Sequence, residues 1–163
     1  SFFISRIDTQ VDKNLPSKSN LKGKAAISNA KLAYKDSLAL FKTREFEELS
    51  ESGANVQRLL WASTSVKDLS FRDVMYVENL IGKNTVNTLP LDTIFAFLDH
   101  GISKNTLEKN IPESSEIINA LQSQNINFEE ITSKLLIDGV TQFEDSYKSL
   151  INGLEDKFFD KNK

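Results

Sequence analysis

The sequence predicts an α/β fold in which strands and helices alternate along the first hundred residues. Three short apolar or β-branched stretches are each followed by a longer stretch whose apolar residues have helical spacing. Helical crossovers of this kind join parallel strands and are almost always right-handed. The rest of the chain carries only helical patterns. We therefore expect three β-α units that build a parallel sheet, followed by C-terminal helices.

The first β-α unit begins at the first residue of the sequence. Residues 1–7 contain a continuous apolar run and predict a strand, residues 8–16 form a polar excursion after it, and residues 17–20 predict a loop. Residues 21–42 are rich in alanine and leucine, which favour a helix. Residues 45–52 predict a second helical piece with its two large apolar side chains facing inward.

The second unit centres on residues 57–68, an apolar run that ends in hydroxyls, a lysine and an acid. We expect a buried strand at about 56–62, a polar loop at 63–70 and a helix at 71–81. Ligands of α/β folds bind at the loops that follow the C-terminal ends of the strands. The run therefore suggests one rim of a sugar-phosphate site.

The third unit is short and has clear stop signals. Residues 85–89 are β-branched and predict a strand that Pro90 ends. Residues 91–100 predict a helix, and Gly101 follows it as a stop signal.

Helices fill the remainder of the chain. Pro112 is expected in the first turn of one helix, and Asn127 is expected to cap the start of another. Residues 138–139 should break that helix. Residues 140–158 place apolar side chains at spacings of three and four and predict a last helix with a buried stripe. The tail, residues 160–163, should fray.

Composition limits the possible classes of protein. The chain has 163 residues, a net charge of −3 and no cysteine. The charge creates no field that recruits nucleic acid, and no apolar run is long enough to span a membrane. The lack of cysteine excludes a disulfide framework, a thiolate zinc site and a cysteine nucleophile. It fits a reducing compartment, and we expect a cytoplasmic location.

Three β-α units make a poor sheet by themselves. A buried parallel strand needs a neighbour on each side and helices on both faces. The first predicted strand already starts at residue 1, and a natural domain rarely begins in the middle of a strand. We therefore expect this chain to be the C-terminal part of a (β/α)8 TIM barrel: its last three units plus C-terminal helices, with the N-terminal barrel units absent.

Several segments together resemble transaldolase, in the longer bacterial-type subgroup. The resemblance covers essentially the whole chain, and it is the combination of segments that makes it specific. It rests on residues 1–8 with Asp12, 60–68 with Tyr76 and Val77, 84–90 leading to 99–101, 23–34, and 138–150.

The resemblance implies a (β/α)8 barrel enzyme of the non-oxidative pentose phosphate pathway. A barrel lysine forms a Schiff base with a ketose phosphate, and a dihydroxyacetone unit then passes to an aldose phosphate. No metal or organic cofactor is implied. The implied partners are sugar phosphates and the missing N-terminal barrel half. The Schiff-base lysine and the two proton-transfer acids lie on strands outside this sequence, so we expect no catalytic residue here and an inactive isolated chain.

The resemblance also implies substrate contacts. Ser1 would lie near the bound substrate, and Arg6 would hold the substrate phosphate, which its planar charged fork suits. Ser63 matches the serine of an alanine-serine pair on the family's seventh strand, and Lys67 falls near the position where shorter members of the family carry a second phosphate-binding arginine. Each has a plainer interpretation: a surface salt bridge for Arg6, a capping hydroxyl for Ser63 and a solvated side chain for Lys67.

Two other residues favour structural roles. His100, at the end of a predicted helix, is expected to interact with the exposed carbonyls or the helix dipole. Trp61, in a predicted strand, is expected in the core. The alternative to an enzyme is a non-catalytic phosphate-binding or assembly module, either a split subunit or a degenerate paralogue.

Overall fold

The computed structural model describes residues 1–159. The chain forms two compact units, Ser1–Phe128 and Glu129–Lys163. The prediction of a frayed tail, residues 160–163, lies outside the described residues. Among the helices that are described, none is both long enough and apolar enough to cross a membrane.

A parallel three-stranded sheet lies at the centre of the first unit. Its strands are β1 (Phe2–Phe3), β2 (Leu59–Ala62) and β3 (Thr85–Asn87), in the order β1-β2-β3. Both pairings are parallel, with Trp61 of β2 level with Phe2 on one side and Asn87 on the other. The predicted parallel sheet is confirmed, and all three strands are shorter than expected.

The first strand ends much earlier than predicted, because the chain turns into a helix at Ile4. Helix α1 spans Ile4–Asn14 and buries Ile4, Ile7 and Val11, which are spaced by three and four residues. That spacing places all three on one helical face. The predicted strand over 1–7 is therefore confirmed only at Phe2–Phe3, and the polar excursion over 8–16 is mostly helical, since helical burial outweighs the β propensity of the short apolar run.

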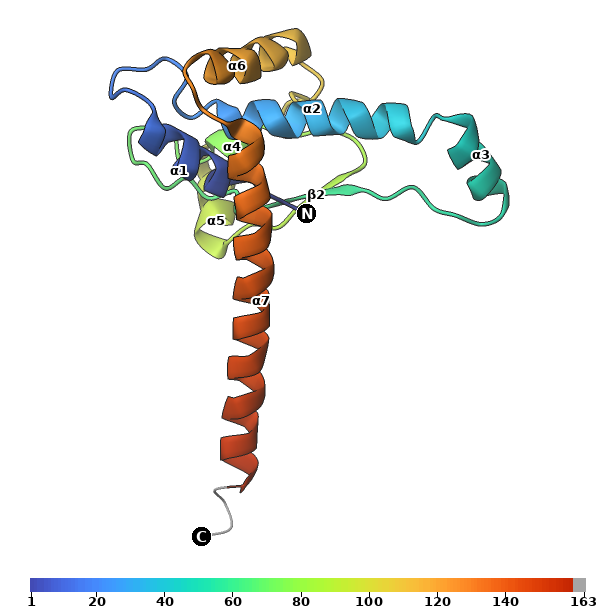
Figure 1. Cartoon of the computed structure of the whole chain (residues 1–163), viewed down its shortest axis with the longest axis vertical. Helices are drawn as coiled ribbons and strands as arrows, with labels where there is room; N and C mark the ends of the chain where they lie inside the picture. Colours follow the sequence, from blue (N-terminus) through green and yellow to red (C-terminus); the bar gives the residue numbers. More distant parts are fainter. Residues whose placement is uncertain (160–163) are drawn as a thin grey trace. The chain divides into compact units, whose positions relative to one another are not determined.

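Helices α2 (Ala25–Leu40) and α3 (Arg44–Glu51) fill the connection to β2 (Figure 1). Helix α2 packs on α1 and on α6 (Ile111–Ser123) with a face of small residues. Thr43 caps α3 by accepting a hydrogen bond from the Phe46 amide, at 3.3 Å. The inward orientation predicted for Leu49 is wrong, because this side chain is 57% exposed.

The later elements follow the predicted order with changed bounds. Helix α4 spans only Met75–Asn79, because the residues before it form a turn closed by the bond from the Met75 amide to the Arg72 carbonyl, at 2.9 Å. Helix α5 spans Leu91–His100, as predicted. Pro112 lies in the first turn of α6, also as predicted.

The second unit is one long helix, α7 (Phe128–Phe159). The predicted break at residues 138–139 is wrong: a glycine inside a helix costs only about 1 kcal/mol, which the flanking turns tolerate. Apolar residues do recur along the helix at spacings of three and four. Most members of the predicted stripe are exposed rather than buried: Val140, Phe143, Tyr147, Leu150, Leu154 and Phe158.

Candidate functional site

The C-terminal ends of the three strands are tied together by hydrogen bonds. The Ser63 carbonyl, just after β2, accepts from the Ser5 amide at 3.0 Å. The Thr64 hydroxyl, fully buried, donates to the Asn87 side-chain oxygen at 2.8 Å. Ser63 itself has a φ of 53°, a left-handed conformation that few residues other than glycine adopt. These contacts hold the predicted loop, which begins at residue 63, against both neighbouring strands.

Ser63 and Arg6 lie at this end of the sheet, whereas Ser1 does not. Arg6 is in the first turn of α1, directly after β1, and its guanidinium carbon lies 4.5 Å from the centroid of the Phe3 ring. Ser1 precedes β1 and is exposed. Phe2 is level with Trp61, so Ser1 is level with the residue before Trp61. That position lies three residues before Ser63 in the sequence.

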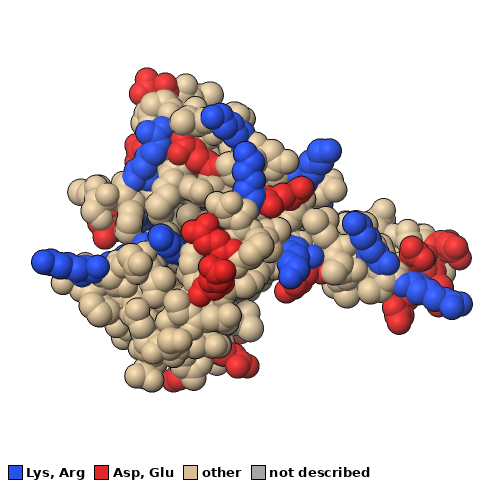
Figure 2. All heavy atoms as spheres, turned by 90° about the horizontal axis from the view of Figure 1, so that it is seen from above, with Lys and Arg blue, Asp and Glu red and all other residues tan. Residues whose placement is uncertain are grey.

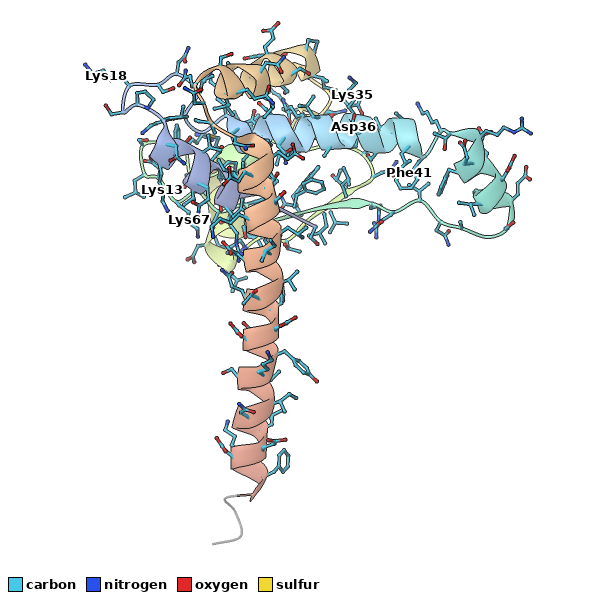
Figure 3. The ribbon with its side chains drawn as sticks, viewed as in Figure 1. Lys13, Lys18, Lys35, Asp36, Phe41 and Lys67 are labelled. Atoms are coloured by element: carbon cyan, nitrogen blue, oxygen red, sulfur yellow. The ribbon has the colours of Figure 1, made fainter. Side chains whose placement is uncertain are left out.

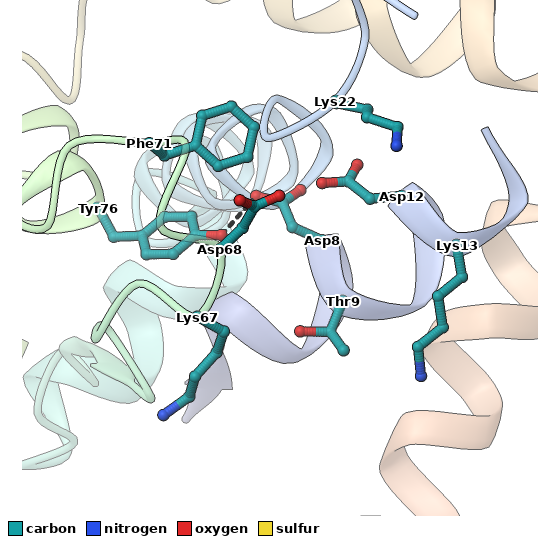
Figure 4. Close-up of a pocket in the computed structure, with 9 residues that line it drawn as sticks. All are labelled: Asp8, Thr9, Asp12, Lys13, Lys22, Lys67, Asp68, Phe71 and Tyr76. Atoms are coloured by element: carbon teal, nitrogen blue, oxygen red, sulfur yellow. Dashed lines mark hydrogen bonds between the residues drawn. The ribbon is translucent and has the colours of Figure 1, made fainter. Parts of the chain in front are cut away.

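Lys67 lies in a different environment from Arg6 and Ser63. Its ammonium group donates to the Ser65 hydroxyl at 3.0 Å. Lys67 lines a pocket of about 370 Å³, which Figure 4 shows in close-up. Figure 3 labels two lysines of this pocket, Lys13 and Lys67, on the whole chain. Neither Arg6 nor Ser63 lines this pocket. The residues that do are Asp8, Thr9, Asp12, Lys13, Lys22, Lys67, Asp68, Phe71 and Tyr76.

A buried carboxylate, Asp8, lies in this pocket and is only 3% exposed. One of its oxygens accepts from the Ala26 amide and the other from the Tyr76 hydroxyl, both at 2.8 Å. Burial raises the pKa of Asp8 to about 6, although both hydrogen bonds oppose the shift. The carboxylate of Asp12, one turn along α1, accepts from the Gly23 amide at 3.0 Å, and burial raises its pKa too.

The sequence predictions missed Asp8 and Tyr76 because they assigned Asp8 to a polar excursion and not to a helix. A usable signal existed: Asp8 and Asp12 are four residues apart and adjoin Ile7 and Val11, so a helix over this segment brings both acids to one side. The partner Tyr76 is 68 residues away in sequence, a contact that local patterns do not reveal.

His100 ends α5, as expected, but its ring contacts are different from those predicted. Its Nε2 lies 2.9 Å from an Asp73 oxygen and its Nδ1 lies 3.1 Å from an Asp99 oxygen. The hydrogen bond with Asp73, followed by that with Asp99, raises the pKa of His100. The ring therefore contacts carboxylates and not the expected carbonyls, whereas the position of His100 in the last turn of α5 fits the expected interaction with the helix dipole. Trp61 is fully buried, as predicted.

The charged side chains of the described residues offer no metal centre: residues 1–159 contain no cluster of three or more His, Asp or Glu side chains that could hold an ion. On the face viewed in Figure 2, acidic and basic side chains are interspersed. The chemistry available near the strand ends comes from the cations Arg6 and Lys67, from hydroxyls, and from the buried Asp8 and half-buried Asp12.

Curated proteins with similar sequences include transaldolases. A protein named "Transaldolase" from Trichodesmium erythraeum is 42% identical over 172 residues, covering 96% of this chain and 45% of the relative. One from Neisseria meningitidis is 45% identical over 151 residues, covering 93% of this chain and 42% of the relative. The chain thus spans less than half the length of these curated relatives. The family described as "Transaldolase/Fructose-6-phosphate aldolase" matches residues 1–154, and the chain belongs to that family.

Proposed function

We propose that this chain is the C-terminal part of a single transaldolase barrel domain, with residues 1–163 supplying its last three β-α units and C-terminal helices. The observation that carries the proposal is the family match over residues 1–154, together with identities of 42% and 45% to transaldolases. The parallel order β1-β2-β3 is the arrangement that such barrel units require. A cytoplasmic location stays a prediction of the sequence.

The proposed reaction transfers a dihydroxyacetone unit from a ketose phosphate to an aldose phosphate. An amine adds to the ketose carbonyl and water leaves, which gives an iminium. The iminium accepts the electron pair of the breaking carbon–carbon bond, the aldose product departs, and the retained unit adds to the carbonyl carbon of the acceptor aldose. Water then hydrolyses the resulting iminium, which releases the new ketose phosphate and returns the free amine. The lysine that would do this belongs to the N-terminal barrel units, and no organic or metal cofactor is needed.

This chain would contribute to phosphate binding. Arg6 and Ser63 both follow strands at the C-terminal end of the sheet, where barrel enzymes place their sites. Ser63 has a left-handed backbone, and strained backbone is common at functional sites. Lys67 is on the same loop as Ser63 but lines the pocket that also contains Asp8, Asp12 and Asp68, which makes it the weaker phosphate contact. Ser1 precedes β1, so it would contact the substrate only if its side chain faced the interior of the barrel.

The partner that completes the site would be the N-terminal barrel half. Within the described sheet β1 and β3 each pair with β2 alone, so each has an edge able to accept a further strand. Helix α5 also exposes Leu91, Phe95 and Leu98, spaced by four and three residues on one face. An apolar stripe of this kind needs a packing partner.

The test combines activity with trapping of the intermediate. We expect no transaldolase turnover from residues 1–163 alone, and turnover when the chain is mixed or co-expressed with the unmatched N-terminal part of the Trichodesmium relative. Borohydride reduction in the presence of fructose 6-phosphate should then give a covalent adduct on the N-terminal polypeptide only. Measurement is by coupled assay and mass spectrometry.

An Arg6→Ala variant of the reconstituted enzyme should raise the KM for sugar phosphate by roughly ten- to a hundredfold, since a charged hydrogen bond contributes about 1.5–3 kcal/mol. Arg6→Lys should recover part of the loss, and Arg44→Ala, on exposed α3, is the control. Turnover or an adduct from the isolated chain would overturn the inactive-fragment proposal. Complex formation without an adduct would favour the alternative, a non-catalytic assembly module.

A further inference from the structure

The side chain of His100 bridges two segments of the first unit that are far apart in sequence. Its Nε2 lies 2.9 Å from an oxygen of Asp73, in the turn before α4, and its Nδ1 lies 3.1 Å from an oxygen of Asp99, on α5. Asp73 is 27 residues away from His100 along the chain. The ring therefore connects the end of α5 to the turn before α4, and we call these three residues the His100 clamp.

The two acceptors of the clamp select a doubly protonated ring. An ionised carboxylate only accepts hydrogen bonds, so Asp73 and Asp99 each need an N–H group from the imidazole. A neutral imidazole has a single N–H, and its other nitrogen presents a lone pair to the second carboxylate. The imidazolium form has two N–H groups and donates to both acids. Its positive charge also suits the last turn of α5, where the helix dipole is negative.

The other charged groups near the ring are Arg72 and Glu78. The guanidinium of Arg72 donates to the backbone carbonyl of His100 and forms an ion pair with Glu78 of α4, at 3.0 Å. The pKa of His100 is raised, first by the hydrogen bond with Asp73 and then by that with Asp99, against the opposing charge of Arg72. The two carboxylates that contact the ring therefore outweigh the neighbouring cation.

We propose that the His100 clamp is a pH-sensitive contact: the doubly protonated ring holds both Asp73 and Asp99, and loss of one proton releases one of the two carboxylates. Asp73 belongs to the segment 63–74, which also carries Ser63 and Lys67. The clamp thus anchors the end of this segment on α5 more firmly in acid than in base. The proposal goes beyond the transaldolase function and does not depend on it, because its tests need no substrate.

The direction of the effect follows from the two protonation states. The folded chain binds the ring proton of His100 more tightly than the unfolded chain, in which the pKa of a histidine is 6.5. The stabilising contribution is complete below pH 6.5 and is lost as the pH rises through the higher pKa of the folded chain. The His100 side chain is 38% exposed, so water and salt screen the contact and we expect a local effect.

Titration of the ring tests the proposal directly, because His100 is the only histidine of the chain. We expect nitrogen NMR of the 163-residue chain to show both ring nitrogens protonated at pH 6 and a titration midpoint above 6.5. Asp73→Asn should lower the midpoint, because an amide can also donate to the neutral ring, and Asp99→Asn should lower it by less. Asp92→Asn is the matched control: it removes an acid from the first turn of the same helix, and neither ring nitrogen contacts it.

Hydrogen exchange measures whether the titration loosens the two connected segments. The Gly101 amide closes the last turn of α5 by donating to the Phe97 carbonyl at 2.9 Å. The Met75 amide closes the turn that contains Asp73 by donating to the Arg72 carbonyl, also at 2.9 Å. After correction for intrinsic exchange rates, protection of both amides should fall roughly two- to fivefold between pH 5.5 and pH 8, the size expected of an exposed ion pair.

His100→Gln should abolish this fall in protection. Burial raises the pKa of Asp8 to about 6, so Asp8 titrates in the same range. Any contribution of Asp8 persists in His100→Gln, and the difference between this variant and the unaltered chain therefore isolates the ring.

Two results would overturn the proposal. One is a midpoint at or below 6.5, or a midpoint that Asp73→Asn leaves unchanged, because the carboxylates then do not select the protonated ring. The other is a pH dependence of protection at Gly101 and Met75 that is the same in His100→Gln, because the ring then holds neither segment. A raised midpoint that falls in Asp73→Asn, with pH-dependent protection that requires His100, supports the clamp.

Discussion

Trp61→Ala is expected to lower the free energy of unfolding of the chain by about 3–5 kcal/mol, the usual range for removing a large buried aromatic. Trp61 is fully buried on the central strand β2. Its ring packs edge-to-face on that of Phe2, with 5.6 Å between centroids, so it joins β2 to β1. Urea unfolding followed by circular dichroism measures the effect, because the variant lacks the only tryptophan.

Trp61→Phe should cost much less, about 1–2 kcal/mol. The indole nitrogen of Trp61 is buried and has no hydrogen-bond partner among the residues that the structure describes. Phenylalanine keeps most of the apolar ring and removes that unpaired donor, whose burial costs about 1–3 kcal/mol. Equal losses in the two variants would show that ring volume is not what stabilises this position.

Gly23→Ala is expected to destabilise the chain by about 2–5 kcal/mol. Gly23 has a φ of 69°, and the left-handed conformation costs a residue with a Cβ about 1–2 kcal/mol. The added Cβ would also lie 2.8 Å from the Phe71 ring, and overpacking adds about 1–3 kcal/mol. Since the Gly23 amide donates to Asp12, a shift of the backbone at Gly23 also disturbs the pocket that Asp12 lines. Thermal unfolding of the 163-residue chain measures the loss.

Gly53→Ala is the matched control for this substitution. Gly53 also has a positive φ, 97°, but nothing lies within 4 Å of the position that its Cβ would take. It therefore carries the backbone cost without the steric overlap. The difference between the two variants isolates the contact with Phe71, and a Gly53→Ala loss as large as that of Gly23→Ala would argue against the overlap.

Local sequence patterns predicted the elements whose signals agree with one another. Helix α5 has a proline before it, a glycine after it and a helical pattern between them, and its bounds were predicted correctly. The segment around Phe2 was harder, because its apolar residues fit a strand while Ile4, Ile7 and Val11 fit a helix. The strand ends after two residues, so helix α1 buries the side chains of Ile4, Ile7 and Val11.

The amino-acid sequence was sufficient to predict the parallel sheet, the buried Trp61 and the family of the chain, because the alternation of strands and helices, the apolar runs and the motifs are all visible along it. Two features appear only in the folded chain: Lys67 and Asp8 line the same pocket, and the Tyr76 hydroxyl donates to Asp8. They bring together residues that are 59 and 68 positions apart. Burial then sets the protonation of Asp8, and burial is a property of the packed molecule that local sequence does not encode.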